Sequence, residues 1–326
     1  MAQTTDAQAT QTPSAPTVEI DTEQSDSVYG DELSSYSASL TSSVQNYEWK
    51  HGRRYHSYQS GSYQFPNDEA EQDRLDMCHH IFFKTLSDQL FLAPINPSGM
   101  RILDLGTGTG DLYPSAELII GNDLSPIQPQ WVPPNVKFVV DDIEQQWTEP
   151  QPYDYIHCRY LCGSIHNWPK LVRQCYENLK PGGWVEFQEP FLVVYSEDDT
   201  LKPDSSFVKM VNLLAEACDK ISRPLNIATS IKGLIEDAGF ESVEEKSLKM
   251  PVGTWPKDAR LKEIGAFNAI NIIEGVEAFT AALFADVLGW SEEEIAVLNA
   301  GVRRDVKTKD NHSIYDFVVV TARKPE

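Results

Sequence analysis

The chain has 326 residues, of which 49 are acidic and 27 are basic, so its formal net charge is −22. That length allows one large domain or two small ones with a buried core. The charge argues against direct binding to nucleic acid or to an anionic membrane, because phosphate groups are bound by clusters of basic residues.

Two further features of the composition concern the compartment. No apolar stretch reaches transmembrane length and the N-terminus lacks the apolar segment of a signal peptide, so we expect a cytoplasmic or nuclear protein without a membrane anchor. The five cysteines are scattered and odd in number. Cys158 and Cys162 have the spacing of half a metal site, but no second pair accompanies them. We therefore expect buried free thiols and no metal.

The N-terminal third divides into two parts. Residues 1–45 are rich in Ser, Thr, Gln, Asp and Ala, which predicts a disordered tail. Residues 46–98 are expected to form an aromatic and helical lid segment: Tyr, Trp and Phe alternate with Arg and His up to residue 66, and a helix over 68–92 follows. Asp68 and Glu71 have the spacing of a capping box at its start, and prolines at 94 and 97 close it.

Residues 99–326 alternate between strand and helix patterns. Short apolar runs predict strands over 102–105, 118–121, 136–140, 155–158 and 184–188, with a helix over 168–179 and a turn at 181–183. This alternation predicts an α/β fold with a doubly wound, mostly parallel, Rossmann-like sheet. In the C-terminal half we expect inserted helices over 205–221, 227–238, 261–288 and 291–302, a strand over 240–250 and a last, antiparallel strand over 315–322.

A glycine turn follows the first of these strands. Gly106, Gly108 and Gly110 let the backbone approach a ligand with no Cβ in the way. Asp123 ends the second strand, where a carboxylate can accept hydrogen bonds from two ribose hydroxyls. The GxGxG spacing differs from the GxGxxG of dinucleotide sites and favours S-adenosylmethionine (SAM) over NAD as the ligand.

The chain resembles the class I SAM-dependent methyltransferases and, within them, the fungal LaeA-like methyltransferases. The motifs that carry the resemblance extend over residues 47 to 190. They are GRRYHSY (52–58), PNDEAEQDRLDMCHH (66–80), ILDLGTGTG (102–110), GNDLSPIQPQWVPPNVKFVVDDIEQQW (121–147), YDYIHCRYLCGSIHNWPKL (153–171) and LKPGGWVEFQE (179–189).

The resemblance implies SAM as the cofactor, and it assigns a role to each matching position. The glycines would approach the methionine carboxylate, and Asp104 would orient the ammonium through the turn or a water. Asp123 would hold the ribose hydroxyls. The implied cofactor-binding residues are Asp104, Gly106, Gly108, Gly110, Asp123, Leu124, Asp142, Ile143, Cys158 and Arg159.

The remaining roles lie on the adenine and methyl-transfer sides. Leu124 and Ile143 would pack on the adenine, Asp142 would accept from its amino group, and Cys158 with Arg159 would line the methyl-transfer side.

Several of these residues also have purely structural interpretations. In these interpretations Asp104 is a turn cap and Arg159 is a partner in an ion pair. Asp142 is a helix N-cap, and Asp141 takes its place at the adenine. His79, on the predicted helix, is expected to be packed or solvated.

The chain departs from the resemblance after the last glycine, where family members carry several more residues. Residues 106–117 must join two parallel strands, and so few residues cannot form both a crossover helix and its turns. We therefore expect a shortened first crossover helix, a partly uncovered sheet face and weakened SAM binding.

Three functions follow from the resemblance. The first is transfer of a methyl group from SAM to a small-molecule acceptor, in fungal secondary metabolism. The second is a LaeA-like regulatory methyltransferase that acts through protein partners, and the third is a degenerate, non-catalytic member of the fold. No catalytic residue is assigned, because methyl transfer needs alignment and exclusion of water more than acid–base catalysis.

Overall fold

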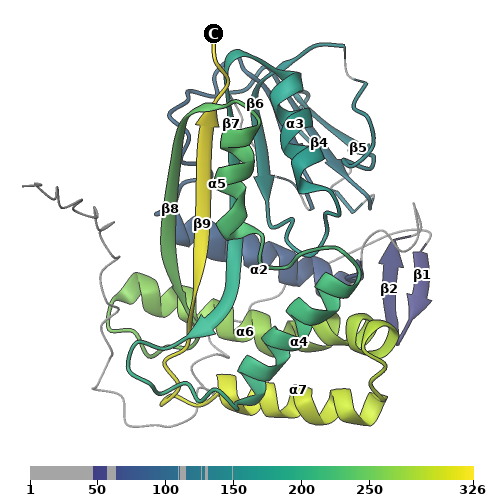
Figure 1. Cartoon of the computed structure of the whole chain (residues 1–326), viewed down its shortest axis with the longest axis vertical. Coiled ribbons are helices and arrows are strands. Elements are labelled where there is room, and N and C mark those ends of the chain that lie inside the picture. The colour runs from purple at the N-terminus through teal and green to yellow at the C-terminus, as the bar shows by residue number, and fades with distance from the viewer. Residues whose placement is uncertain are drawn as a thin grey trace, which may run out of the picture.

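The structure is a computed structural model that describes residues 47–56, 64–108, 110, 115–125, 127–128, 131–148 and 150–326. The predicted tail over 1–45 and part of the predicted lid lie outside these residues. A sheet with helices on one face forms the upper part of the molecule, and a layer of helices lies beneath it (Figure 1).

Seven strands form the central sheet in the order β5-β4-β3-β6-β7-β9-β8. β5, β4, β3, β6 and β7 are parallel, and β9 is antiparallel to both β7 and β8. The predicted doubly wound, mostly parallel sheet with an antiparallel last strand is therefore confirmed. The strands are β3 (Arg101–Leu105), β4 (Leu118–Asp123), β5 (Val136–Val140), β6 (Tyr153–Arg159), β7 (Leu179–Tyr195), β8 (Glu241–Pro251) and β9 (Ile314–Arg323).

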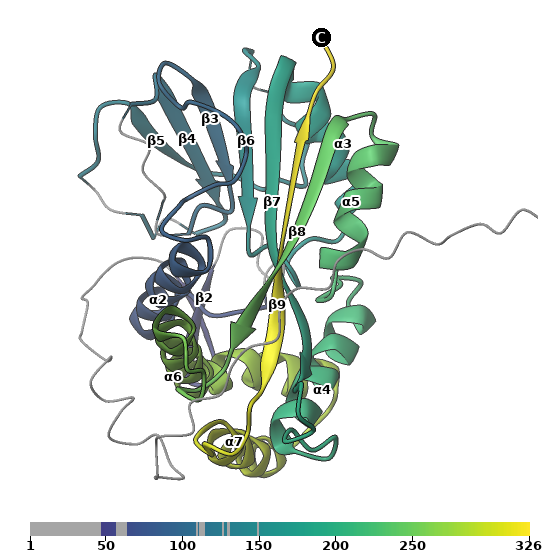
Figure 2. The same cartoon turned by 90° about the vertical axis from the view of Figure 1, so that its left-hand side faces the viewer.

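The helices lie where the sequence pattern placed them, apart from their ends. α3 and α5 cover one face of the sheet beside β6, β7 and β8 (Figure 2). α2 runs across the lower ends of the parallel strands, and α4, α6, η1 and α7 form the layer beneath (Figure 1). Their bounds are α2 (Glu69–Thr85), α3 (Trp168–Asn178), α4 (Ser206–Lys220), α5 (Ala228–Asp237), α6 (Ala259–Ala282), the π-helical η1 (Leu283–Val287) and α7 (Glu292–Val306).

A hairpin precedes these elements. β1 (Tyr47–Lys50) and β2 (Arg53–His56) pair antiparallel around His51 and Gly52, whose φ angles are 49° and 73°. The sequence interpretation gave this segment no strands. A two-residue turn with positive φ at both positions is the usual connection of a tight hairpin, and Gly52 was the available signal.

The predicted helix over 68–92 is wrong at its C-terminal end, because α2 ends at Thr85. Ser87 and Asp88 have φ angles of 59° and 60°, which turn the chain out of the helix. At its start, Asp68 is the N-cap and accepts from the Glu71 amide at 3.0 Å. The Glu71 side chain binds Arg74 instead of completing the capping box.

The expectation of an uncovered sheet face is also wrong over β3 and β4. Ile102 and Ile119 are 0% and 1% exposed, and Leu90, Phe91 and Ile95 pack on the same cluster. Residues 90–95, which follow α2, thus cover the face where a longer crossover helix would be expected. None of the described residues within 106–117 is helical, while 109 and 111–114 lie outside the described part.

A buried carboxylate holds this covering segment on the sheet. Glu186 of β7 is 0% exposed and accepts from the amide of Ala93 at 2.7 Å and from that of Leu92 at 2.9 and 3.0 Å. The Gln188 side chain donates to the Leu90 carbonyl at 3.0 Å. Residues 90–95 form neither helix nor strand, so these side chains satisfy backbone groups that a helix would satisfy itself.

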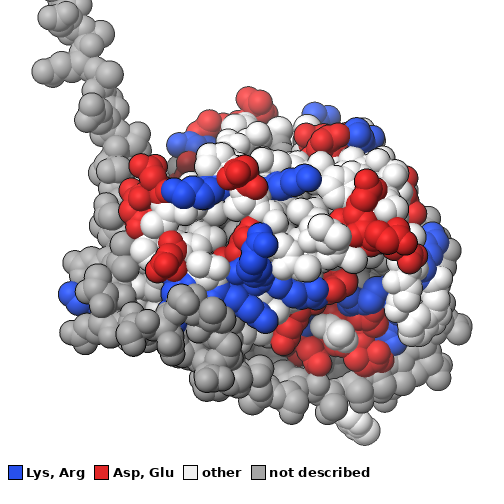
Figure 3. Space-filling model, turned by 90° about the horizontal axis from the view of Figure 1, so that it is seen from below, with Lys and Arg blue, Asp and Glu red and all other residues white. Residues whose placement is uncertain are grey.

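Basic and acidic side chains lie side by side on the face shown in Figure 3. Arg303 of α7 pairs with Glu277 at 2.5 Å. Across the described residues, we find no helix with both the length and the apolar character to span a bilayer. All five cysteines are buried free thiols, as the sequence predicted.

Candidate active site

A cavity of about 150 Å³ opens at the carboxyl ends of β3, β4 and β6, beneath which α2 passes. This is the edge where open α/β sheets bind ligands. Eight of the ten predicted cofactor-binding residues line it: Gly106, Gly108, Gly110, Asp123, Leu124, Asp142, Ile143 and Arg159. We call it the cofactor cavity.

The other two predicted residues, Asp104 and Cys158, are buried and do not line the cavity. Asp104 is 4% exposed; its Oδ1 lies 3.0 Å from His157 Nδ1, and its Oδ2 accepts from the Thr107 hydroxyl at 2.6 Å. Cys158 is fully buried against Cys175, and burial raises the pKa of its thiol. Among the described residues, Asp104 is therefore connected to the cavity through Thr107, which lines it.

The glycine turn bonds largely within the protein. The Thr107 amide donates to the Asn122 carbonyl and the Gly110 amide to the Thr107 carbonyl, both at 2.9 Å. A Cβ at Gly110 would lie 2.7 Å from the Phe138 ring, so a larger residue does not fit there. At Gly108 a Cβ would meet no described residue within 4 Å, so the backbone there borders open space.

Asp123, the last residue of β4, lies beside this turn. Its Oδ2 accepts from the Gly108 amide and its Oδ1 from the Ser125 amide, each at 2.9 Å. These bonds orient the carboxylate, whose oxygens are acceptors of the kind that bind ligand hydroxyls.

Beyond the end of the neighbouring strand β5, Asp142 caps a turn. Its carboxylate accepts from the Glu144 amide at 2.9 Å and from the Gln145 side chain at 3.0 Å. Asp141 accepts from the Asp142 amide at 2.8 Å and also lines the cavity. Asp142 thus caps a turn and not a helix, since residues 143–148 are not helical, and the adenine contact remains a prediction.

His79 is a cavity residue that the sequence interpretation left aside. Arg159 Nη2 lies 3.0 Å from His79 Nδ1. A guanidinium only donates, so Nδ1 accepts and the imidazole proton is on Nε2. No local pattern would have paired these two residues, because α2 and β6 meet only in the tertiary structure.

Tyr160 lines both this cavity and a second one. Its φ is 58°, an uncommon conformation for a bulky residue, and strained backbones concentrate at functional sites. Its ring packs edge-on against Phe82 at 5.4 Å, and burial raises the pKa of its hydroxyl. Among the described residues no hydrogen bond to this hydroxyl is formed.

The second cavity, of about 80 Å³, lies between α2, α4, α6 and β7 and is mostly apolar. We call it the acceptor cavity. It shares four lining residues with the cofactor cavity: Cys78, Phe82, Tyr160 and Ser164. Its one charged lining residue within the described part is Arg74, whose Nη2 and Nε pair with Glu71 at 2.5 and 2.9 Å. Arg74 also donates to Asn271 at 2.9 Å.

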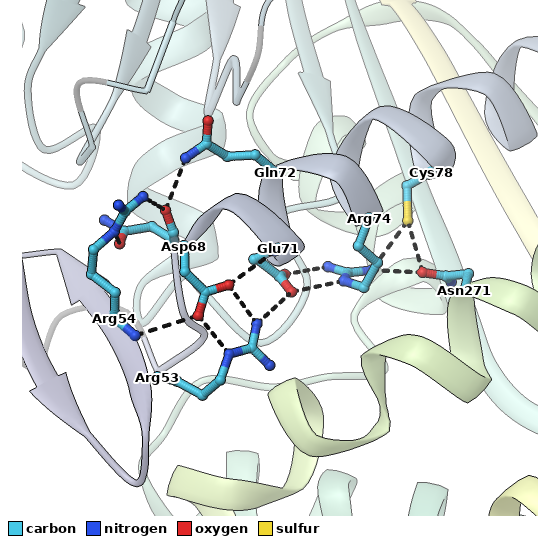
Figure 4. Close-up of polar contacts among 9 residues, drawn as sticks. Arg53, Arg54, Asp68, Glu71, Gln72, Arg74, Cys78 and Asn271 are labelled. Atoms are coloured by element: carbon cyan, nitrogen blue, oxygen red, sulfur yellow. Dashed lines mark hydrogen bonds and ion pairs between the residues drawn. The ribbon is translucent and has the colours of Figure 1, made fainter. Parts of the chain in front are cut away.

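The hairpin is tied to the cofactor cavity through the start of α2 (Figure 4). Arg53 binds both oxygens of Asp68 at 2.5 and 2.7 Å, and Arg54 binds the Asn67 side chain at 3.2 Å. Burial opposes ionisation of Asp68, but the hydrogen bonds and charge of Arg53 outweigh it and lower the pKa of this carboxyl. Asn67 lines the cavity and donates to the Ser125 hydroxyl at 3.1 Å.

Comparisons with known proteins agree with this geometry. A family model described as a methyltransferase domain matches residues 77–245. The chain is 58% identical to methyltransferase pytC of Aspergillus terreus, over 88% of this chain and 91% of that protein. It is 37% identical to the secondary metabolism regulator LAE1 of Cochliobolus heterostrophus, over 85% and 94%.

Among solved structures, a phosphoethanolamine N-methyltransferase 2 of Haemonchus contortus in complex with SAM has a TM-score of 0.43 and 20% identity, covering 78% of this chain and 52% of that one.

A sheet of this order with a glycine turn and an acid at its carboxyl edge defines a Rossmann-like nucleoside-cofactor protein. The chain belongs to the methyltransferase family and is a SAM-dependent methyltransferase.

Proposed function

We propose that this protein transfers a methyl group from SAM to a small, largely apolar acceptor bound in the acceptor cavity, within fungal secondary metabolism. One observation carries the proposal: the two cavities share the wall formed by Cys78, Phe82, Tyr160 and Ser164. A donor in one cavity and an acceptor in the other would meet at this wall. The relative pytC, named a methyltransferase, supports the same class of reaction.

The cofactor cavity supplies groups for each part of SAM. Asp123 would hold the ribose hydroxyls, Asp142 and Ile143 the adenine, and Gly108 the methionine end, where the backbone borders open space. When bound, SAM supplies an electrophilic methyl group on its sulfonium. Arg159 and His79 would face the methyl-transfer side from β6 and α2.

The acceptor cavity favours an uncharged ligand. Glu71 neutralises Arg74, so a charged acceptor would lose its hydration without gaining a partner of opposite charge among the described residues. Its thiols and phenols stay protonated, because burial raises the pKa of Cys78, Cys162, Tyr160 and Tyr315. The cavity would therefore act by aligning the acceptor and excluding water.

A second candidate is a regulatory methyltransferase that works with a protein partner, which the 37% identity to a regulator of secondary metabolism supports. For both candidates we propose a cytoplasmic or nuclear location, in keeping with five free thiols. The enclosed apolar cavity favours the small-molecule acceptor over a protein side chain.

The test uses the purified chain with SAM labelled in its methyl group. Titration calorimetry first measures SAM binding, and the chain is then incubated separately with the organic extract and the protein extract of the source organism. We expect label in the organic extract and expect Leu214→Trp, which fills the acceptor cavity, to abolish that transfer while SAM still binds. Label confined to protein would favour the regulatory function, and absence of SAM binding would refute both.

A further inference from the structure

We propose that His157 is a positioning residue for the cofactor: through Asp104 and Thr107 it fixes the glycine turn in the orientation that receives the methionine end of SAM. The inference rests on the proposed function. It assigns a task to two buried side chains, Asp104 and His157, that do not touch the cofactor cavity themselves.

A series of hydrogen bonds connects His157 of β6 to the glycine turn. Asp104 and His157 are directly paired across β3 and β6, and on a strand the side chains of such a pair point to the same face. His157 Nδ1 and Asp104 Oδ1 are 3.0 Å apart, and Asp104 Oδ2 accepts from the Thr107 hydroxyl at 2.6 Å. Thr107 is followed by Gly108, whose amide donates to Asp123 at 2.9 Å.

Burial of His157 at this position lowers the stability of the fold. Its side chain is 0% exposed, and its Nε2 is buried without a hydrogen-bond partner among the residues that the structure describes. A buried polar atom without a partner destabilises the fold, and an apolar side chain would avoid that cost. Its Nδ1–H, which donates to Asp104, is the feature that an apolar side chain could not supply.

The turn needs such a support in this chain. In a longer crossover the turn runs directly into a helix, whose hydrogen bonds fix the direction of the first amides. Here none of the described residues within 106–117 is helical. The Thr107 hydroxyl instead links the turn to Asp104, which is embedded in the sheet at 4% exposure.

The test separates the methionine end of SAM from its adenosine. Binding of SAM and of 5′-methylthioadenosine, which lacks the amino-acid end, is measured by calorimetry for Thr107→Val and Thr107→Ser. Val keeps the shape and removes the hydroxyl, whereas Ser keeps the hydroxyl. We expect Thr107→Val to weaken SAM binding about tenfold with methylthioadenosine changed less than about twofold, and Thr107→Ser to bind both ligands like the wild type.

A second pair tests His157 itself. His157→Asn keeps a donor near the position of Nδ1 and His157→Leu removes it, so we expect only His157→Leu to lose SAM affinity selectively. If His157→Leu does not fold, the Thr107 pair decides. The proposed positioning role would be refuted if Thr107→Val bound SAM as tightly as the wild type. It would also be refuted if Thr107→Val lost affinity for SAM and for methylthioadenosine equally. Failure of the wild type to bind either ligand would instead refute the proposed function.

Discussion

The side chain of Asn67 donates a hydrogen bond to the Ser125 hydroxyl over 3.1 Å, joining residues 58 positions apart in the sequence. Asn67 also accepts from Arg54 of the hairpin at 3.2 Å, and Ser125 follows Asp123 at the mouth of the cofactor cavity. This contact connects the N-terminal hairpin to the group that we propose binds the ribose.

We expect this connection to affect cofactor binding. Asn67→Ala and Ser125→Ala should each weaken SAM binding, and the double variant should be no weaker than either alone, since both single changes remove the same bond. A coupling free energy of about 0.5–1.5 kcal/mol is expected from a double-mutant cycle measured by calorimetry. Strictly additive effects would show that the hairpin and the cavity are independent.

Asp123→Ala tests the proposed ribose contact. Loss of a charged acceptor should weaken SAM binding by about 1.5–3 kcal/mol, with the fold retained. Calorimetry gives the affinity, and circular dichroism checks the fold. Unchanged affinity in a folded variant would remove Asp123 from the site.

The pH dependence of stability should reveal the ionisation of the Glu189 carboxyl. This carboxyl is fully buried, which raises its pKa to about 8 against the opposing effect of the hydrogen bonds from the Leu161 and Cys162 amides, at 2.8 and 2.9 Å. Between about pH 4.5 and pH 8 the folded state therefore holds a proton that the unfolded state has released, so stability falls as the pH rises through this window.

Thermal unfolding measured from pH 5 to pH 9 checks this sign. We expect the wild-type Tm to fall over the window and the Tm of Glu189→Gln to vary less, although that variant starts lower because one amide then faces an NH₂ group. Parallel curves for the two proteins would assign the pH dependence to other groups.

Glu186 should be a main support of the covering segment. Glu186→Leu leaves the buried amides of Leu92 and Ala93 without an acceptor and should lower the free energy of unfolding by about 2–5 kcal/mol. Glu186→Gln keeps one acceptor and should cost less. Urea denaturation followed by tryptophan fluorescence measures both, and equal stability of all three proteins would contradict this role.

Much of the sheet and the outline of the cofactor cavity follow from local sequence. The strand at β3, the glycine turn and the strand ending in Asp123 are recognisable because each depends on neighbouring residues: apolar runs for buried strands, glycines for positive φ and an acid at a strand end. The bounds of β5 and the capping box of Ser291 at α7 were predictable for the same reason.

Only the tertiary structure decided which distant groups meet. Asp104 pairs with His157 and Arg159 with His79 because strands and helices far apart in the sequence are packed together. The same holds for residues 90–95, of which 90–92 were predicted to be helical. Hydrogen bonds to Glu186 and burial against an apolar sheet face hold this segment outside the helix, and no local pattern reveals either contact. The acceptor cavity likewise arises from the packing of α2, α4 and α6 against β7.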